Sequence, residues 1–295
     1  MTPMRDKQPN ELDISFIIPM YNRLALTKAC LASLEETVKG VTYEVLLIDD
    51  GSTDGTREFV AGLGPPYHVI LNHENLGYAA SNNIGAKLAR APVLCLLNND
   101  TILTSRWIEP MVHLLHRSTE IGLVGNIQIN MRTRLLDHAG VFFDLDGHPE
   151  HAHRGRKKIP KGRYSEWNAV SAACCVIRRE TFLSFGGFDE AFRNGYEDVD
   201  LCVQMRLAGL RLMVSHESVI FHYVGGSPNR AAHDRVNKEL LLQRWSNITS
   251  VWGQQEWPVE YLRRYARRWW RYRLSKVMLA LWLMVRDRLV TKDAT

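Results

Sequence analysis

Two acidic clusters far apart in the chain carry side chains suited to chemistry. Asn98-Asn99-Asp100 follows an apolar run at 93–97, and Glu197-Asp198 lies in the stretch 194–201. An aspartate after a buried strand is placed to hold a hard divalent cation, and a second carboxylate can take a proton from a nucleophile. His222 follows another apolar run, and it suits a metal as a neutral imidazole or a diphosphate as an imidazolium. Together these groups predict transfer of a group from a diphosphate-bearing donor.

The first hundred residues alternate between short apolar runs and segments with helical spacing. The runs predict buried strands at 14–18, 45–48, 69–71 and 93–97, and helices at 24–37, 53–63 and 78–89 lie between them. This βαβ series is typical of a parallel sheet with helices on both faces. Ligands of such sheets bind beyond the carboxyl ends of the strands, and polar residues follow each predicted strand. We therefore expect one polar rim that includes Asp100.

Asp49-Asp50 comes directly after the second predicted strand. Capping of the following helix alone would explain the segment. An equally good interpretation is that one acid caps the helix and the other accepts hydrogen bonds from a nucleobase or a ribose. No glycine-rich phosphate loop follows the first strand. The diphosphate must then be held in another way, and a metal ion is the natural substitute.

The second half is less regular. A strand is expected at 121–127, a hairpin turn at 144–148, a small-residue apolar stretch at 168–177 and an exposed basic loop at 151–163. The loop is either solvated or faces an anionic substrate. A helix is expected at 196–206, with Leu201, Met205 and Leu207 on its buried side. Its first turn holds Glu197, Asp198 and Asp200, which the helix dipole favours but which exceed what a dipole requires.

The chain has 295 residues, of which 45% are hydrophobic, and this composition is typical of a globular protein. The five cysteines are odd in number and lack paired spacing, which argues against a disulfide frame or a zinc site and favours a reducing compartment. The polar segment 1–12, expected to be flexible, lacks the apolar core of a signal peptide, so nothing in it indicates export.

The segment from Tyr261 onward has a charge of its own. It holds ten Lys/Arg against two Asp, whereas the whole chain has a net charge of +5, so the preceding body carries −3. The apolar run at 277–285 is too short to span a bilayer, which takes about 20 residues. A basic, Trp-rich amphipathic helix can instead lie on an anionic membrane, or it can dock on the body or on a second subunit. An acidic body argues against nucleic acid as the partner.

Seven motifs occur in order along the chain. They are Ile17-Ile18-Pro19-Met20-Tyr21-Asn22, the stretch 47–56 around Asp49-Asp50-Gly51-Ser52, the stretch 75–85 that contains Asn82-Asn83, Leu96-Leu97-Asn98-Asn99-Asp100-Thr101, Gly187-Phe188-Asp189-Glu190, Tyr196-Glu197-Asp198-Val199-Asp200-Leu201 and His222-Tyr223-Val224-Gly225-Gly226-Ser227. The ordered set resembles glycosyltransferase family 2, in its bacterial rhamnosyltransferase-like branch, over residues 13–245.

The resemblance implies a GT-A fold, in which a Rossmann-like mixed sheet has helices on both faces, and inverting transfer from a nucleotide-diphosphate sugar. Pro19, Tyr21, Asn22, Asp49 and Asp50 would hold the nucleoside, with Asn82, Asn83, Asn98 and Asn99 near the base, ribose or diphosphate. Asp100, with His222, would bind Mn²⁺ or Mg²⁺. The family commonly has Asp-x-Asp where this chain has Asn98-Asn99-Asp100, so one carboxylate is replaced by an amide. Asp198 would be the general base and Glu197 would orient the acceptor.

These expectations divide the chain at fixed points. Residues 13–125 would bind the nucleotide-sugar, 126–245 would form the acceptor and catalytic half of the same domain, and 246–295 would be the basic helical tail. The acceptor would be a glycan or a lipid-linked glycan of the cell envelope. The protein would lie on the cytoplasmic face of an anionic membrane, and the sequence is compatible with a monomer or a homo-oligomer. The alternatives are a nucleotidyltransferase and a non-catalytic membrane-associated adaptor.

Overall fold

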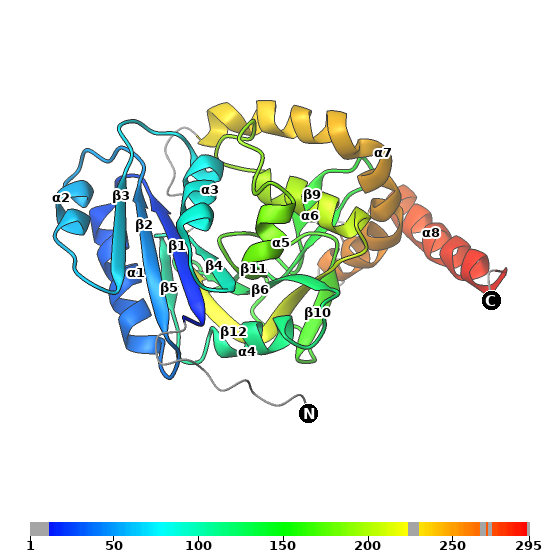
Figure 1. Ribbon diagram of the computed structural model, residues 1–295. Coiled ribbons are helices and arrows are strands. Elements are labelled where there is room, and N and C mark those ends of the chain that lie inside the picture. Colours follow the sequence, from blue (N-terminus) through cyan, green and yellow to red (C-terminus); the bar gives the residue numbers. More distant parts are fainter. Residues whose placement is uncertain (1–11, 224–229, 266–269, 271–272, 294–295) are drawn as a thin grey trace.

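A mixed β-sheet flanked by helices forms the centre of the protein (Figure 1). The computed structural model describes residues 12–223, 230–265, 270 and 273–293. The strand order is β10-β12-β6-β11-β4-β1-β2-β3, with β5 paired to β12 and β7 to β6. Strands β3, β2, β1 and β4 are parallel, β11 runs antiparallel between β4 and β6, and β12 is parallel to β6. The expected mixed α/β architecture is confirmed.

Strands alternate with helices in the first half of the chain, whereas several strands follow one another directly in the second half. The strands are β1 (Ile14–Met20), β2 (Tyr43–Asp49), β3 (Tyr67–Leu71), β4 (Val93–Leu97), β5 (Thr101–Leu103), β6 (Ile121–Asn130), β7 (Leu136–His138), β8 (Val141–Phe143), β9 (Pro149–His151), β10 (Tyr164–Trp167), β11 (Cys174–Arg178) and β12 (Arg211–His222). The helices are α1 (Leu24–Thr37), α2 (Thr56–Ala61), α3 (Tyr78–Leu88), α4 (Glu109–Leu115), α5 (Arg179–Ser184), α6 (Glu197–Leu207), α7 (Arg230–Tyr265) and α8 (Leu274–Asp293).

Two layers of core lie on opposite faces of the sheet. Phe16 and alternate residues of β1 pack on α1 and α4, where Trp107 is fully buried. Ile17 and its neighbours pack on the other face against α3, α5, α6 and the start of α7. Alternation along a strand sends successive side chains to opposite faces, so a strand covered on both faces is apolar throughout. The parallel strands therefore read as continuous apolar runs in the sequence.

Two expectations about helices are wrong in detail. Helix α2 begins at Thr56, because Gly55 takes a left-handed conformation (φ 87°) and the Asp54 carboxylate accepts the N–H of Thr56. It ends at Ala61, ahead of a segment rich in Gly and Pro that cannot continue a helix. Leu207, expected on the buried side of α6, is 52% exposed because it lies at the last turn, where the chain leaves the core.

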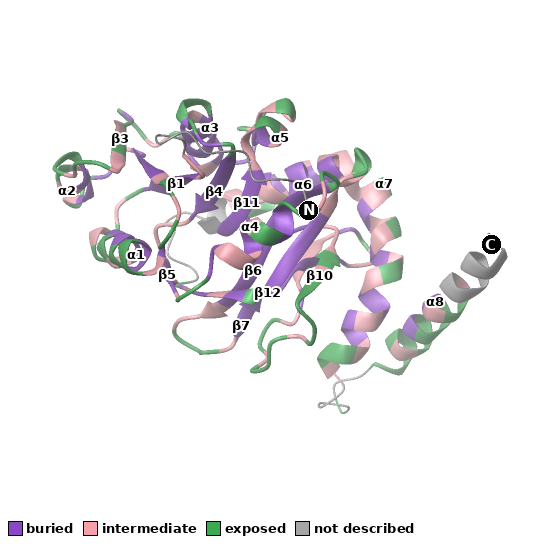
Figure 2. Ribbon diagram, turned by 60° about the horizontal axis from the view of Figure 1, so that its bottom comes forward, coloured by how far each residue is buried: buried purple, intermediate pink, exposed green. Residues whose placement is uncertain are grey.

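The C-terminal helices differ in how they are held. Helix α7 runs unbroken through the expected boundary at residue 245 and crosses the second half of the protein (Figure 1). Trp257 and Tyr261 are buried with Phe142, and Ala280 and Leu283 of α8 join the same cluster. The rest of α8 projects from the body (Figure 2). The expected tail therefore consists of a docked part and an exposed part.

Candidate active site

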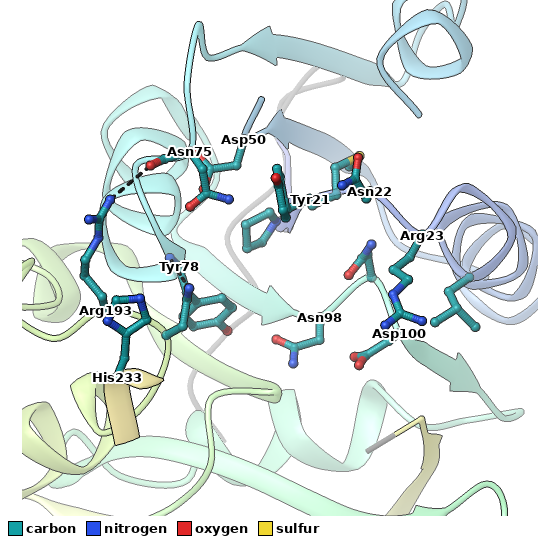
Figure 3. Close-up of a pocket in the computed structure, with 15 residues that line it drawn as sticks. Tyr21, Asn22, Arg23, Asp50, Asn75, Tyr78, Asn98, Asp100, Arg193 and His233 are labelled. Atoms are coloured by element: carbon teal, nitrogen blue, oxygen red, sulfur yellow. Dashed lines mark hydrogen bonds between the residues drawn. The ribbon is translucent and has the colours of Figure 1, made fainter. Parts of the chain in front are cut away.

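A pocket of about 520 Å³, called pocket A, opens at the carboxyl ends of β1 and β4, beside the residues before α3 and α6 (Figure 3). Parallel strands end at the same edge of a sheet, so the polar residues that follow them lie close together there. Pocket A is lined by Asp100 and by six of the expected donor-binding residues: Pro19, Tyr21, Asn22, Asp50, Asn98 and Asn99. The predicted polar rim thus corresponds to a real cavity.

Asp49, Asn82 and Asn83 are not among the residues that line pocket A. Asp49 is fully buried, and its carboxylate accepts hydrogen bonds from Arg57 Nε (3.0 Å) and the Ser52 amide (3.3 Å). Asn83 donates to the Phe188 carbonyl and accepts from the Phe188 amide, both at 2.8 Å. Asn82 is fully buried and donates to the Tyr78 carbonyl at 2.9 Å. The three side chains therefore pack beside pocket A, and the Asp49 Oδ1 and Asn82 Oδ1 atoms are buried without a partner among the residues that the structure describes.

Asp50 both lines the pocket and shapes it. Its carboxylate accepts hydrogen bonds from Asn72 Nδ2 (2.8 Å) and from the amides of Leu76 and Gly77 (both 2.9 Å). These bonds fix the segment that leads into α3. Asp54, rather than Asp49 or Asp50, accepts the Thr56 amide at the start of α2. Both acids have hydrogen-bond partners, and the Asp49 Oδ1 atom is buried without one in the described part of the chain.

Asp100 and His222 meet at the floor of the site, although 122 residues separate them. Pairing of β5 with β12 places Thr101 opposite His222, and His222 Nε2 lies 3.1 Å from Asp100 Oδ1. The His222 Nδ1 atom and the Asn98 Oδ1 atom are buried without a partner in the described protein. Unpartnered buried polar atoms are costly unless a ligand satisfies them. A carboxylate, an imidazole and an amide oxygen form a donor set that fits Mn²⁺ or Mg²⁺ when phosphate oxygens complete it.

A second pocket of about 500 Å³, called pocket B, shares Tyr78, Asn98 and Asn194 with pocket A. Asp198, Glu197 and His222 line it, together with residues of β6, β7 and the β8–β9 hairpin. Asp198 Oδ2 accepts the Ala172 amide at 3.0 Å, and its Oδ1 accepts the Val199 amide at 2.9 Å. Each carboxylate oxygen keeps a further lone pair, so the group is oriented and still able to accept a proton.

Glu197 and Asp200 have different surroundings from Asp198. Glu197 is 5% exposed and accepts the Gly195 amide at 2.7 Å. Asp200 is fully buried and binds Trp245 Nε1 (2.7 Å) and Arg244 (3.3 Å) of α7. Asp200 therefore fastens α7 to α6, whereas Glu197 and Asp198 face pocket B.

A strained turn forms the wall between the two pockets. Asn194 (φ 57°), Gly195 (φ 143°) and Tyr196 (φ 74°) all have positive φ, which non-glycine residues adopt at a cost of about 1–3 kcal/mol each. Asn194 Oδ1 accepts the Tyr78 amide at 3.0 Å, and Asn237 Nδ2 of α7 donates to the carbonyls of Arg193 (2.7 Å) and Gly195 (2.9 Å). Two distant segments, at Tyr78 and at Asn237, thus hold the conformation that starts α6 at Glu197.

Several residues that line pocket A are not among those that the sequence assigns to donor binding. They are Arg23, Asn75, Tyr78, Arg193 and His233, of which Arg23 and Asn75 belong to the expected polar rim, and Figure 3 shows Arg23 on the same side of the pocket as Asp100. Burial raises the pKa of Tyr78 well above its ordinary value, so its hydroxyl stays protonated and donates to the Ala172 carbonyl at 2.8 Å. Tyr78 and Asn75 do lie in one of the seven motifs. No local signal marks Arg193 or His233, because only the fold brings them to the pocket.

The expected basic loop divides between site and surface. His151 and Arg154 line pocket B, and Arg154 Nε lies 3.3 Å from Asp137 Oδ1. The motif residues Val224, Gly225, Gly226 and Ser227 lie outside the described residues, as do residues 1–11 of the expected flexible N-terminus.

Helix α8 exposes apolar side chains on the outer part of the tail. Leu274, Met278, Leu281, Trp282 and Val285 are between 47% and 77% exposed. Within the described ranges, we find no helix both long and apolar enough to cross a bilayer. Trp269 and residues 266–268 of the expected basic face lie outside those ranges.

Comparisons with known proteins agree with this geometry. The family model described as glycosyl transferase family 2 matches residues 15–184. The O-antigen biosynthesis protein RfbC of Myxococcus xanthus is 30% identical over 227 residues, which cover 72% of this chain and 17% of that protein. Validoxylamine A glucosyltransferase of Streptomyces hygroscopicus subsp. jinggangensis is 28% identical over 266 residues, 78% of this chain and 58% of that protein. The chain thus spans less than two thirds of either relative.

Solved structures share the fold at low identity. GalNAc-T7 in complex with UDP, GalNAc and Mn²⁺ superposes with a TM-score of 0.64 at 18% identity, over 81% of this chain and 49% of that one. The mannosyltransferase PcManGT of Pyrobaculum calidifontis, with GDP-Man and Mn²⁺, gives 0.57 at 16% identity, over 96% and 81%. These similarities establish the GT-A fold that the motifs predicted. The match of the family model over more than half of the chain shows that the protein belongs to glycosyl transferase family 2.

Proposed function

We propose that the protein is an inverting glycosyltransferase that moves a sugar from a nucleoside-diphosphate donor in pocket A to a hydroxyl of an acceptor in pocket B. The observation that carries this proposal is the junction of the two pockets at Asn98, with Asp100 and His222 beneath it and Asp198 on the acceptor side. A transferred sugar must lie between a leaving diphosphate and an incoming hydroxyl, and this junction provides such a place.

In the proposed reaction Asp198 accepts the proton of the acceptor hydroxyl. The acceptor oxygen then bonds to the anomeric carbon on the face opposite the leaving group. The bond from that carbon to the diphosphate oxygen breaks, and its electron pair leaves with the nucleoside diphosphate. The two amides that hold the Asp198 oxygens fix the direction of its lone pairs, which a general base requires. Glu197 is proposed to orient the acceptor.

Asp100, His222 and Asn98 are proposed to hold a divalent cation. When bound, such an ion supplies positive charge to the diphosphate as it becomes the leaving group. Pro19, Tyr21, Asn22, Asp50 and Asn99 are proposed to contact the nucleoside side of the donor, since they line pocket A. Structural neighbours crystallised with UDP or GDP-Man and Mn²⁺ support a nucleotide and a divalent ion here.

The donor sugar and the acceptor are also proposals. A rhamnose donor follows from the resemblance to the rhamnosyltransferase-like branch, and the O-antigen relative supports a cell-envelope glycan as acceptor. The exposed apolar residues of α8 and its neighbouring basic residues support attachment to the cytoplasmic face of an anionic membrane.

The test is a panel of nucleotide-sugars with Mn²⁺ or Mg²⁺ and a mixture of lipid-linked and soluble glycan acceptors. We expect release of nucleoside diphosphate together with a glycosylated product of inverted anomeric configuration. Release of sugar 1-phosphate instead, with transfer of the nucleoside monophosphate to the acceptor, would identify a nucleotidyltransferase. An absence of turnover and of donor-induced thermal stabilisation across the panel would reject the proposal.

A further inference from the structure

A third pocket extends pocket B toward the C-terminal helices. This pocket C, of about 510 Å³, shares Pro149, His151 and Arg154 with pocket B, and its far side consists of Arg264 and Tyr265 at the end of α7. Since pockets A and B also share lining residues, the three pockets adjoin in series from Asp100 to the end of α7, and this series is called the groove. A single sugar would fill only part of this length, so the groove suits an elongated acceptor.

Cationic side chains mark pocket C. Arg264 lies 2.6 Å from Glu150, and Arg154 lies 3.3 Å from Asp137. Both arginines are substantially exposed, at 42% and 60% of their side chains. Ion pairs at such exposure contribute little, typically about 0–1 kcal/mol, so an anionic ligand can compete with the carboxylates for the guanidinium donors. A guanidinium carries five N–H groups in a planar fork that matches phosphate.

His151 adds an imidazole to the same pocket. Burial lowers the pKa of His138, and the charges of His151 and His222 lower it further, so His138 is neutral. The Ser171 amide donates to His138 Nε2 at 3.5 Å, which leaves the proton of His138 on Nδ1, 3.1 Å from His151 Nδ1. His138 Nδ1 is thus held against His151 Nδ1, and this contact fixes the His151 ring where it lines pocket C.

The hairpin that forms pocket C also anchors α8. Phe142 of β8 and Ala152, which follows β9, pack with Trp257, Ala280 and Leu283. The exposed apolar residues of α8 thus belong to a helix fixed on the same hairpin that supplies Pro149, Glu150 and His151 to the pocket. One end of the groove holds the proposed catalytic residues, and the other end is cationic and lies on the hairpin that holds α8.

We infer that pocket C binds the phosphate group of a lipid-linked acceptor, with Arg154, Arg264 and His151 as its donors and α8 beside the lipid. This inference rests on the proposed function and names its acceptor class: a glycan joined through a phosphate or diphosphate to an apolar chain. The sugar to be extended then lies in pocket B beside Asp198, and the lipid leaves the groove toward the surface that α8 contacts.

Binding of farnesyl diphosphate to the full-length protein in EDTA tests the inference without any turnover. EDTA removes the cation on which diphosphate binding in pocket A would depend, so Asp100→Asn should bind the probe like the wild type. Arg154→Ala and Arg264→Ala should each weaken binding about tenfold or more, because each removes a charged donor to phosphate. Arg163→Ala, which breaks an exposed ion pair with Glu217 elsewhere, should leave it unchanged.

Two further variants separate the inference from general damage. Glu150→Gln should tighten binding several-fold, because it removes the carboxylate that competes for Arg264, and misfolding cannot produce a gain. Leu281→Glu should weaken the binding of farnesyl diphosphate but not the binding of inorganic pyrophosphate.

Unchanged binding in both arginine variants, or loss of binding in Asp100→Asn, would overturn the phosphate site. Equal affinity for pyrophosphate and farnesyl diphosphate would identify a soluble anionic acceptor and overturn the lipid assignment. Absent turnover with intact binding would reject only the proposed function.

Discussion

Replacing Glu256 by Gln should stabilise the protein at alkaline pH and not at acidic pH. Glu256 lies on α7, where its carboxylate accepts the Phe143 amide at 3.0 Å and Asn168 Nδ2 at 3.1 Å. Burial raises the pKa of Glu256 from 4.5 to about 7, against the lowering effect of these hydrogen bonds and of Arg206. The folded protein therefore binds this proton more tightly than the unfolded chain does.

The sign and size of the effect follow from linkage. Between pH 4.5 and about 7 the unfolded chain loses the proton first, so stability falls as the pH rises, and above pH 7 the full penalty is present. A shift of this size corresponds to about 3 kcal/mol. An amide offers one acceptor oxygen in place of two, so Glu256→Gln loses one hydrogen bond, worth about 1 kcal/mol. The net gain at pH 8 is then about 2 kcal/mol.

Urea unfolding followed by tryptophan fluorescence at pH 4.5, 6 and 8 measures this difference. At pH 8 the variant should also melt about 4–8 °C higher, and at pH 4.5 it should be no more stable than the wild type. Glu239→Gln is the control, because it removes the same charge from the same helix at a side chain that is 65% exposed. A constant difference between Glu256→Gln and wild type at all three pH values would refute the reasoning.

Four other changes test separate parts of the structure. Asp198→Asn should lower transfer by about 10²–10⁴ while donor binding changes little, and wild-type turnover would move the base to Glu197. Asp100→Asn should abolish the metal-dependent part of the thermal stabilisation by nucleoside diphosphate, and equal stabilisation of both proteins in EDTA and in Mn²⁺ would contradict it. Gly253→Ala should destabilise by about 2 kcal/mol or more in urea, because its Cβ would lie 1.9 Å from the Asp144 carbonyl oxygen, whereas Gly64→Ala meets no atom within 4 Å and should be neutral. Leu281→Glu should release the protein from vesicles of acidic lipid without changing its melting temperature, and retained binding, or a monomer replacing a dimer, would assign α8 to another role.

The sequence predicts best where structure depends on local pattern. Helix α1 at Leu24–Thr37 and strand β4 at Val93–Leu97 have the expected bounds, because a strand buried on both faces and an amphipathic helix leave clear periodicities. Asp100, Glu197 and Asp198 line the pockets at places that their positions after a strand and before a helix had indicated.

The remainder depends on contacts between distant segments. Asn194 joins the site through a hydrogen bond to Tyr78, 116 residues away, and pairing of β5 with β12 brings His222 to Asp100. Asn83 belongs to a motif but does not line pocket A, because its side-chain amide forms hydrogen bonds with the backbone of Phe188. The extent of α7 also escaped the sequence, because apolar and basic residues near Tyr261 have the same pattern whether they face protein or lipid.

The strained turn at Asn194–Tyr196 has a consequence for the order of events. Asn194 lines both pockets, and Gly195 and Tyr196 line pocket B. We expect a ligand that changes the conformational equilibrium of this turn in one pocket to alter affinity in the other. Thermodynamic reciprocity then requires that the factor by which donor improves acceptor binding equals the factor by which acceptor improves donor binding. Asn237 ties this turn to α7, whose far end adjoins pocket C. We therefore expect a phosphate ligand in pocket C to change the affinity for nucleotide in pocket A.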